Sequence, residues 1–243
     1  MTTVLKLGGS VITEKDRPET VDEPMLERAA ASVADLPGRL VVVHGGGSFG
    51  HHHAAAHGVS AADGTRNDDG IRAIHGAMKR LNGTVVDCLA DAGVAAVPVH
   101  PFSAARRRSD GGLELATAPI ETMLDEGLVP VLHGDVVAHD GAGATIVSGD
   151  ELVVSLAIAL DAERVGVCSS VSGVYDAEGE VIDRIDSFES IRDAVGASNA
   201  TDVTGGMAGK VRELLSLDVP AYVFDIDGLE SFVAGGDPGT EIV

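Results

Sequence analysis

The sequence of 243 residues lacks tryptophan and contains only two cysteines. Aromatic residues make up 3 % of the chain against 44 % hydrophobic residues, so we expect a core of aliphatic side chains. Cys88 and Cys168 belong to no CxxC motif, which argues against a disulfide framework or a zinc site. No apolar run approaches the roughly 20 residues that span a bilayer. The segment MTTVLKLGGS also lacks the basic and apolar regions of a signal peptide, so we expect a soluble cytoplasmic protein.

Lysine is scarce as well. The chain has four lysines against thirteen arginines, and its 38 acidic residues give a formal net charge of −21. A surface this acidic would repel polyanions, which argues against nucleic acid and anionic membranes as partners. It also suggests a high-salt cytoplasm, because screening by salt suppresses the repulsion between surface carboxylates. An acidic bias in a GC-rich genome is the alternative explanation.

Short runs of Val, Leu and Ile alternate with Ala-rich amphipathic segments, and this alternation predicts an α/β fold with a mostly parallel sheet. The predicted strands are 3–7, 39–44, 95–100, 128–133, 164–169 and 221–226. The predicted helices are 23–35, 51–57, 70–92, 117–126, 150–160, 187–196, 206–217 and 228–234. Residues 140–150 are predicted to form a turn, a short strand and a helix cap.

Glycine-rich turns recur near the ends of predicted strands and the starts of predicted helices. They are GGS at 8–10, GGGSFG at 45–50, SGD at 148–150 and TGGM at 204–207. In a parallel sheet such turns line the ligand crevice, where backbone N–H groups and helix N-termini bind anions. Several turns of this kind indicate a long phosphate path or two phosphorylated ligands that meet.

The glycine and histidine run at 45–57 allows two other interpretations. Gly45, Gly47 and Gly50 match the GxGxxG dinucleotide fingerprint, but the acidic strand end that this fold requires is replaced by the polar segment 64–70. A P-loop motif is absent. The histidines could instead suggest a metal site, yet only alanines separate His53 from His57. We therefore expect the histidines at 52, 53 and 57 to face solvent, whereas His51 follows Gly50 directly and is predicted to face the crevice.

Three of the four lysines lie beside glycine-rich turns. Lys6 interrupts an apolar strand, where an unpaired ammonium would be costly to bury, and Lys15 follows the first turn. Lys210 is predicted in the first turn of a helix, an unfavourable place for a cation unless an anion binds there. Lys79 has the pattern of an ordinary helix-surface residue. The run Arg106–Arg108 precedes a polar turn and is interpreted as solvated surface or a subunit contact.

Five segments in order along the chain carry a resemblance to a known family: KLGGSVITEK, HGGGSFGH, HGDVV, SGDELVVSLA and DVTGGMAGK. Together they resemble the amino acid kinase superfamily, and within it the isopentenyl phosphate kinases. The histidine that closes GGGSFGH, His51, is the feature shared with these and with the related fosfomycin kinases. The segment 168–176 departs from the family pattern, because Ser170 stands where an acidic residue is usual.

The resemblance implies a three-layer αβα sandwich around a mostly parallel sheet. It implies a single domain, 1–243, with an acceptor-binding lobe at about 1–139 and a nucleotide-binding lobe at about 140–243. It also implies a homodimer that uses ATP and Mg²⁺ to convert isopentenyl phosphate into isopentenyl diphosphate in archaeal isoprenoid synthesis.

The chemistry of such a transfer fits these residues. Two dianionic groups about 4 Å apart involve four charge pairs, and at about 4 kcal/mol each these repel by about 16 kcal/mol, so several positive groups are required. The predicted catalytic residues are Lys6, Lys15, His51, Asp150 and Lys210, with Asp150 orienting lysines by ion pairing. The predicted ATP-binding residues are Lys6, Gly8, Gly9, Ser10, Gly47, Asp150, Ser170, Gly173, Tyr175, Gly206 and Lys210. The predicted acceptor-binding residues are Gly46, His51 and Gly149, with Ile74 and Met78 for the hydrocarbon tail. No residue is predicted as a metal ligand.

Some alternatives stay open at this point. Ile74 and Met78 also fit plain core packing, which is the commoner origin of an apolar helix stripe. Another acceptor is conceivable, such as a phosphonate of the fosfomycin type, UMP or a carboxylate. A non-catalytic oxyanion-binding protein of the same fold is a third interpretation, but mere binding would not require all three lysines.

Overall fold

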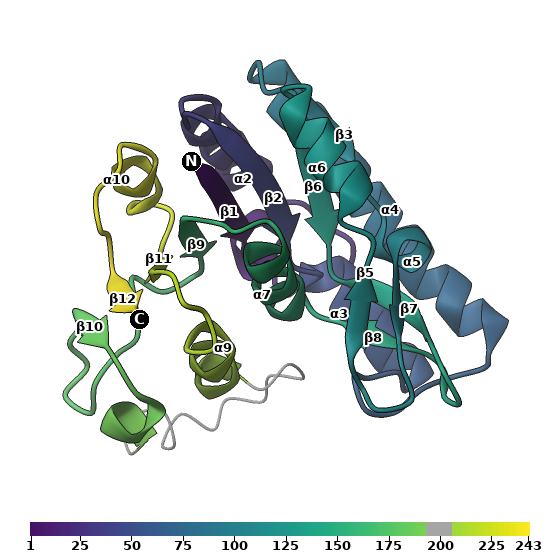
Figure 1. Ribbon diagram of the computed structural model, residues 1–243. Helices are drawn as coiled ribbons and strands as arrows, with labels where there is room; N and C mark the ends of the chain where they lie inside the picture. The colour runs from purple at the N-terminus through teal and green to yellow at the C-terminus, as the bar shows by residue number, and fades with distance from the viewer. Residues whose placement is uncertain (193–205) are drawn as a thin grey trace.

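A twisted sheet of eight strands forms the centre of the computed structural model, which describes residues 1–192 and 206–243 (Figure 1). The strand order is β10-β12-β11-β9-β1-β2-β6-β3. All neighbours are parallel except β11 and β12, so the predicted mostly parallel sheet is confirmed. The strands are β1 (Thr2–Leu7), β2 (Arg39–His44), β3 (Ala96–Pro98), β6 (Val129–His133), β9 (Arg164–Cys168), β10 (Arg184–Ile185), β11 (Ala221–Phe224) and β12 (Thr240–Ile242).

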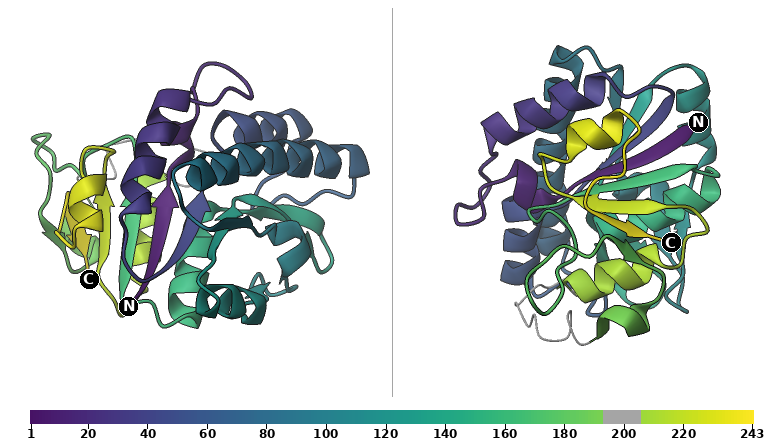
Figure 2. Two further views of the ribbon diagram at one scale, coloured as in Figure 1. Left: turned by 90° about the horizontal axis from the view of Figure 1, so that it is seen from above. Right: turned by 90° about the vertical axis from the view of Figure 1, so that its left-hand side faces the viewer.

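Helices cover both faces of this sheet, which gives the expected three layers (Figure 2). One face carries α2 (Glu23–Ala34), α4 (Asp68–Asp91) and α10 (Leu229–Val233); the other carries α6 (Ala118–Asp125), α7 (Gly149–Ala159) and α9 (Gly206–Leu214). Each face has its own aliphatic cluster. Few of the buried side chains among the described residues are aromatic, as the composition predicts.

Strand β1 is buried along its whole length because it lies between β2 and β9. Its register places Lys6 between Val43 and Val167, so a lysine stands in the middle of the sheet, one residue before the strand ends. Two short helices, α1 (Gly9–Ile12) and α3 (Gly47–His57), begin directly at the glycine turns that follow β1 and β2. The glycine turns and Lys6 therefore lie together at the carboxyl ends of the central parallel strands.

A second sheet has four strands, most of which the sequence pattern does not predict. Its order is β5-β4-β7-β8, with β4 (Ala105–Arg107), β5 (Leu113–Leu115), β7 (Asp135–His139) and β8 (Gly143–Val147). Only β8 was anticipated. The β7–β8 hairpin joins strands from both sides of the expected lobe boundary at residue 139. A four-residue helix, α5 (Pro101–Ala104), leads into β4.

Several predicted boundaries are corrected by the structure. The helix expected at 51–57 begins at Gly47, so the glycines form its first turn instead of a separate loop. The strand expected at 95–100 is only three residues long. Of the helix expected at 187–196, residues Phe188–Ile191 form a 3₁₀ turn, and 193–196 lie outside the described residues. Strands β10 and β12 were not predicted at all, because each is too short to show a pattern.

Among the described residues, no helix combines the length and the apolar character needed to cross a membrane.

Candidate active site

The glycine turns that follow β1, β2 and β6 meet the N-terminus of α7. A Cβ atom on Gly9 would collide with the backbone of Gly47, so the first two turns are in direct contact. A Cβ atom on Gly134 would lie 3.5 Å from the amide nitrogen of Gly149 and 3.9 Å from that of Gly46. The close approach of these backbones requires glycine at Gly9, and it gathers amides from distant parts of the chain.

Many N–H groups at this edge are available to a ligand. Helix N-termini leave their first amides unpaired, and here three helices begin side by side. Within the described part of the chain, the following backbone amides donate to no other protein group: Gly9, Ser10, Gly46, Gly47, Gly149 and Asp150. Such an arrangement of amides and helix N-termini binds anions, phosphates above all.

Three of the predicted catalytic residues lie together beside these amides. The Lys6 ammonium is 2.5 Å from Oδ1 of Asp150, and Lys210 Nζ is 3.2 Å from the same oxygen. Lys6 comes from β1 and Asp150 from the first turn of α7. Lys210 was expected in the first turn of its helix, but it is the fifth of the nine residues of α9 and so lies at the middle of that helix. Asp150 thus holds two cations from the sheet and from a neighbouring helix at one point.

Burial and pairing shift the pKa values of this triad. Burial lowers the pKa of Lys6 to about 8, because desolvation of the ammonium outweighs the attraction of Asp150. Burial acts in the opposite direction on Asp150, but Lys6 and Lys210 outweigh it and lower the pKa of Asp150 to about 2. At neutral pH the cluster carries two positive charges and one negative charge, so a net positive centre faces the free amides.

A half-buried carboxylate adjoins this cluster and was not anticipated. Glu213 lies one turn beyond Lys210 on α9, and its Oε2 atom is buried without a hydrogen-bond partner among the described residues. Burial and the nearby carboxylates of Asp150 and Glu151 raise the pKa of Glu213 to about 7. Its helical spacing from Lys210 was visible in the sequence, but its burial was not.

Lys15 and His51, the other two predicted catalytic residues, have exposed side chains. Lys15 follows the bridge between Thr13 and Val21, and His51 stands in the second turn of α3. Neither forms an ion pair within the described residues. Their roles in catalysis therefore remain predictions, and their exposure leaves both free to contact a substrate.

The expectation that His53 simply faces solvent is wrong. Its Nε2 atom lies 2.6 Å from a carboxylate oxygen of Glu19, whose other oxygen accepts from Arg80 at 2.6 Å. This network of ion pairs connects α3 to α4 through Glu19, which lies in the segment before α2. His52, by contrast, is exposed as expected.

The two residues predicted for the acceptor tail are buried. Ile74 belongs to a small apolar cluster with Val136 and Ala144, and Met78 lies beneath the second glycine turn. A Cβ atom on Gly46 would be 3.6 Å from the Met78 sulfur. Both side chains are part of the core, and contact with a hydrocarbon tail stays a prediction.

The predicted nucleotide loop follows β9. Ser170 and Tyr175 are exposed there, whereas Gly173 is buried against Val181 and Thr240, which leave no room for a side chain. Gly206 begins α9 with a positive φ of 61°. Gly8 packs against the carbonyl of Cys168. The preceding part of the TGGM motif, residues 204 and 205, lies outside the described residues.

The interpretation of Arg106–Arg108 as solvated surface is wrong for its middle residue. Arg107 is 7 % exposed and makes a bidentate ion pair with Glu151, with N–O distances of 2.6 and 2.8 Å. Strand β4 alternates its side chains, so Arg107 points inward while Arg106 and Arg108 point outward. This pair fastens the second sheet to the first turn of α7, next to Asp150.

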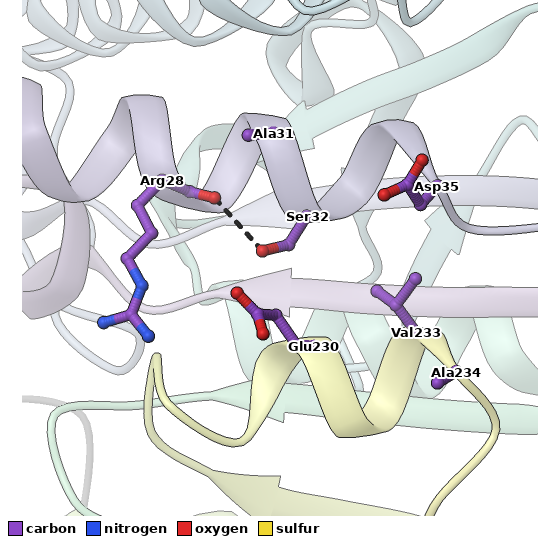
Figure 3. A pocket seen from close by; sticks show the side chains of 7 residues that line it. All are labelled: Arg28, Ala31, Ser32, Asp35, Glu230, Val233 and Ala234. Atoms are coloured by element: carbon purple, nitrogen blue, oxygen red, sulfur yellow. Dashed lines mark hydrogen bonds between the residues drawn. The ribbon is translucent and has the colours of Figure 1, made fainter.

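The structure also has a groove on its surface that lies apart from this site. It lies between α2 and α10 and is lined by Arg28, Ala31, Ser32, Asp35, Glu230, Val233 and Ala234 (Figure 3). Its charged residues have mixed signs, and none of the predicted site residues takes part. Among the described residues, no group of three His, Cys, Asp or Glu side chains is placed to hold a metal ion.

Comparisons with known proteins agree with this geometry. The model of the amino acid kinase family matches residues 1–218. The chain is 64 % identical over 241 residues to the isopentenyl phosphate kinase of Haloferax volcanii, a match that covers 98 % of this chain and 97 % of the other. It is 37 % identical over 229 residues to the enzyme of that name from Methanothermobacter thermautotrophicus, covering 88 % and 86 % of the two chains.

A solved X-ray structure of an isopentenyl phosphate kinase superimposes with a TM-score of 0.86 at 31 % identity and covers both chains fully. The chain therefore belongs to the amino acid kinase family and, within it, to the isopentenyl phosphate kinases.

Proposed function

We propose that this protein transfers the γ-phosphoryl group of ATP to isopentenyl phosphate and releases isopentenyl diphosphate and ADP. The observation that carries the proposal is the cluster of Lys6, Asp150 and Lys210 beside six free backbone amides. The names of the relatives at 64 % and 37 % identity support the choice of acceptor.

The main requirement of the reaction is stabilisation of negative charge, and proton transfer is less important. A phosphate monoester is already ionised at neutral pH, so its oxygen can attack without a strong base. The barrier comes from bringing two dianions together. Lys6 is held at the strand end where the two glycine turns touch, so we assign it to the transferring group. Lys210 approaches from α9 and is assigned to the β- and γ-phosphates, while Asp150 keeps both ammonium groups in place.

The chain suits a metal that arrives on the nucleotide. Mg²⁺ is commonly held by substrate phosphates with one or two protein carboxylates. The carboxylate nearest to the amides, Asp150, is already paired with two lysines. We therefore infer that Mg²⁺ is bound mainly by ATP, where it would neutralise phosphate charge.

His51 is assigned to the acceptor phosphate, to which it would donate a hydrogen bond. His51→Ala should lower kcat/KM for isopentenyl phosphate about 100-fold or more, because a donor to developing charge is lost. His52→Ala is the matched control, since His52 is the exposed neighbour on the same helix. Steady-state kinetics of both variants test the assignment. Equal kinetics for the two variants would refute it.

Three further features belong to the proposal. The protein is inferred to work as a homodimer, in the cytoplasm and in high salt. The acidic surface supports the last of these, and light scattering of the purified protein in molar KCl tests the first.

A further inference from the structure

Two buried histidines begin the motifs HGGG and HGD and lie outside the lysine cluster. His44 ends β2 and His133 ends β6. They are register partners on these adjacent parallel strands, and their rings stack with centroids 5.5 Å apart. Both side chains are completely buried, directly beneath the glycine turns that gather the free amides.

Each histidine donates to the carbonyl of the glycine that follows it. His44 Nδ1 is 3.1 Å from the oxygen of Gly45, and His133 Nδ1 is 3.0 Å from that of Gly134. A carbonyl oxygen can only accept, so Nδ1 carries the proton in both rings. Burial lowers the pKa of His44 to about 4 and that of His133 well below its usual value, so both rings are neutral at pH 7.

The far side of the His133 ring agrees with this tautomer as it stands, and that of the His44 ring agrees with it once the Asn82 side-chain amide is turned over. With Nδ1 protonated, Nε2 is an acceptor. His133 Nε2 lies 2.9 Å from His100 Nδ1, which can donate to it. His44 Nε2 lies 3.1 Å from Oδ1 of the Asn82 side-chain amide, an oxygen that can only accept and so cannot donate to Nε2 in this tautomer. When the amide is rotated by 180° about its last side-chain bond, its NH₂ group faces Nε2. This also gives a partner to the Asn82 amide nitrogen, which is buried without one among the described residues.

The hydrogen bond to Gly45 fixes the direction of the next amide. The described peptide bonds are all trans, and in a trans peptide the C=O and N–H groups point in opposite directions. Because the Gly45 carbonyl points at the buried His44 ring, the N–H of Gly46 points away from it. Gly46 has no side chain to restrict its backbone, so the hydrogen bond supplies a constraint that the residue itself lacks.

We propose that His44 is a positioning residue for the acceptor phosphate, which holds the Gly45–Gly46 peptide so that the Gly46 N–H is aimed at a phosphate oxygen. His133 braces Gly134, the glycine between the amides of Gly46 and Gly149. The inference rests on the proposed function, since that function places the acceptor phosphate at Gly46.

Three variants separate positioning from simple packing. His44→Leu removes the donor and keeps an apolar side chain of similar bulk. His44→Asn keeps a donor near the place of Nδ1, because the Asn amide nitrogen occupies a comparable position. Asn82→Leu removes the partner at Nε2 but leaves the Nδ1 bond to Gly45 intact. Thermal unfolding of all three in molar KCl reports how far each change affects the fold.

Steady-state kinetics with ATP and isopentenyl phosphate give the decisive comparison. We expect His44→Leu to lower kcat/KM for isopentenyl phosphate about tenfold or more, mostly through KM, and His44→Asn to recover most of the loss. Asn82→Leu should lower the melting temperature and leave KM unchanged. Unchanged KM in His44→Leu, or an equal rise in KM in Asn82→Leu, overturns the proposal.

A spectroscopic measurement makes the inference independent of the acceptor. Long-range ¹H–¹⁵N spectra of histidine-labelled wild-type protein show which ring nitrogen of His44 holds the proton. A proton on Nδ1 supports the proposal, and a proton on Nε2 overturns it. If the wild-type protein does not phosphorylate isopentenyl phosphate, the proposed function fails, while the tautomer still decides whether His44 holds the Gly45 carbonyl.

Discussion

Lys6 carries its charge inside the central sheet, so we expect the activity to depend on whether its amine is protonated. Its pKa of about 8 lies below the ordinary 10.5, so the ammonium is charged at pH 7 and neutral well above pH 8. We predict that kcat/KM of the free enzyme falls as pH rises through about 8, because the neutral amine no longer attracts phosphate. A pH–rate profile checks this, and a flat profile up to pH 9.5 would count against it.

Substitution of Lys6 should remove its positive charge at every pH and lower the rate of phosphoryl transfer. Lys6→Met keeps the length of the side chain and should reduce kcat by about 100-fold or more, because the cation nearest the transferring group is lost. Lys79→Met is the control, as Lys79 has an exposed side chain on α4. Single-turnover assays measure both variants. Similar rates for the two would contradict the role of Lys6.

The raised pKa of Glu213 predicts an effect on stability and not on activity. Its pKa of about 7 in the folded protein exceeds the ordinary 4.5, so the folded state binds the proton more tightly than the unfolded state. The contribution of Glu213 to stability is complete below about pH 4.5 and is lost as pH rises through 7. Glu213→Gln should therefore melt at a higher temperature than the wild type at pH 8.

The Glu213→Gln difference should shrink towards zero near pH 4.5, where the wild-type carboxyl is protonated in both states. Calorimetry at the two pH values measures it. An unchanged or lower melting temperature of the variant at pH 8 would show that the carboxylate is compensated.

Sequence reasoning found the residues whose types are unusual for their neighbours. Lys6 was identified because a lysine in an apolar strand needs a partner, and Asp150 proved to be that partner. It failed for residues whose types are ordinary. Glu213 and Arg107 have common spacings, and only the folded chain shows that Arg107 is buried against Glu151 and that an oxygen of Glu213 is buried near Asp150.

At the scale of elements, the pair of Arg107 and Glu151 connects the second sheet to α7. Arg107→Met leaves the Glu151 carboxylate without its cation, but that side chain is 28 % exposed and keeps part of its hydration, so the variant should be destabilised by about 1–3 kcal/mol. Arg106→Met is the matched control, because Arg106 is 56 % exposed and its pair with Glu114 contributes little. Urea denaturation measures both.

The double variant Arg107→Met with Glu151→Met removes both charges and should recover most of the lost stability. If the double variant is as unstable as Arg107→Met, the cost comes from lost packing and not from an unpaired charge.

Elements with a strong hydrophobic pattern were predictable, and short ones were not. Strand β2 contains a continuous apolar run at 40–43, and the structure gives the strand its predicted bounds. Strands β4, β5 and β7 have only three to five residues each, too few to show a hydrophobic pattern, and the pairing of β4 with β7 joins residues about 32 positions apart. The start of α3 at Gly47 was also unpredictable, because glycine disfavours helices and is accepted here for the close contact with Gly9.

At the scale of the whole molecule, the net charge of −21 is the dominant feature. Salt shortens the Debye length from about 10 Å at 0.1 M to about 3 Å at 1 M, which screens repulsion between surface carboxylates. We predict that the melting temperature rises between 0.1 M and 1 M KCl and then levels off. A melting temperature that is constant or falls over this range would exclude self-repulsion as a major term.

The central claim is that the lysine cluster and the free amides serve phosphoryl transfer to isopentenyl phosphate. The most direct test measures ADP release by the purified protein in molar KCl with ATP, Mg²⁺ and one acceptor at a time. We predict rapid ADP release with isopentenyl phosphate and little with fosfomycin, UMP or N-acetylglutamate. No turnover with isopentenyl phosphate, or a higher kcat/KM with one of the other three, would contradict the account.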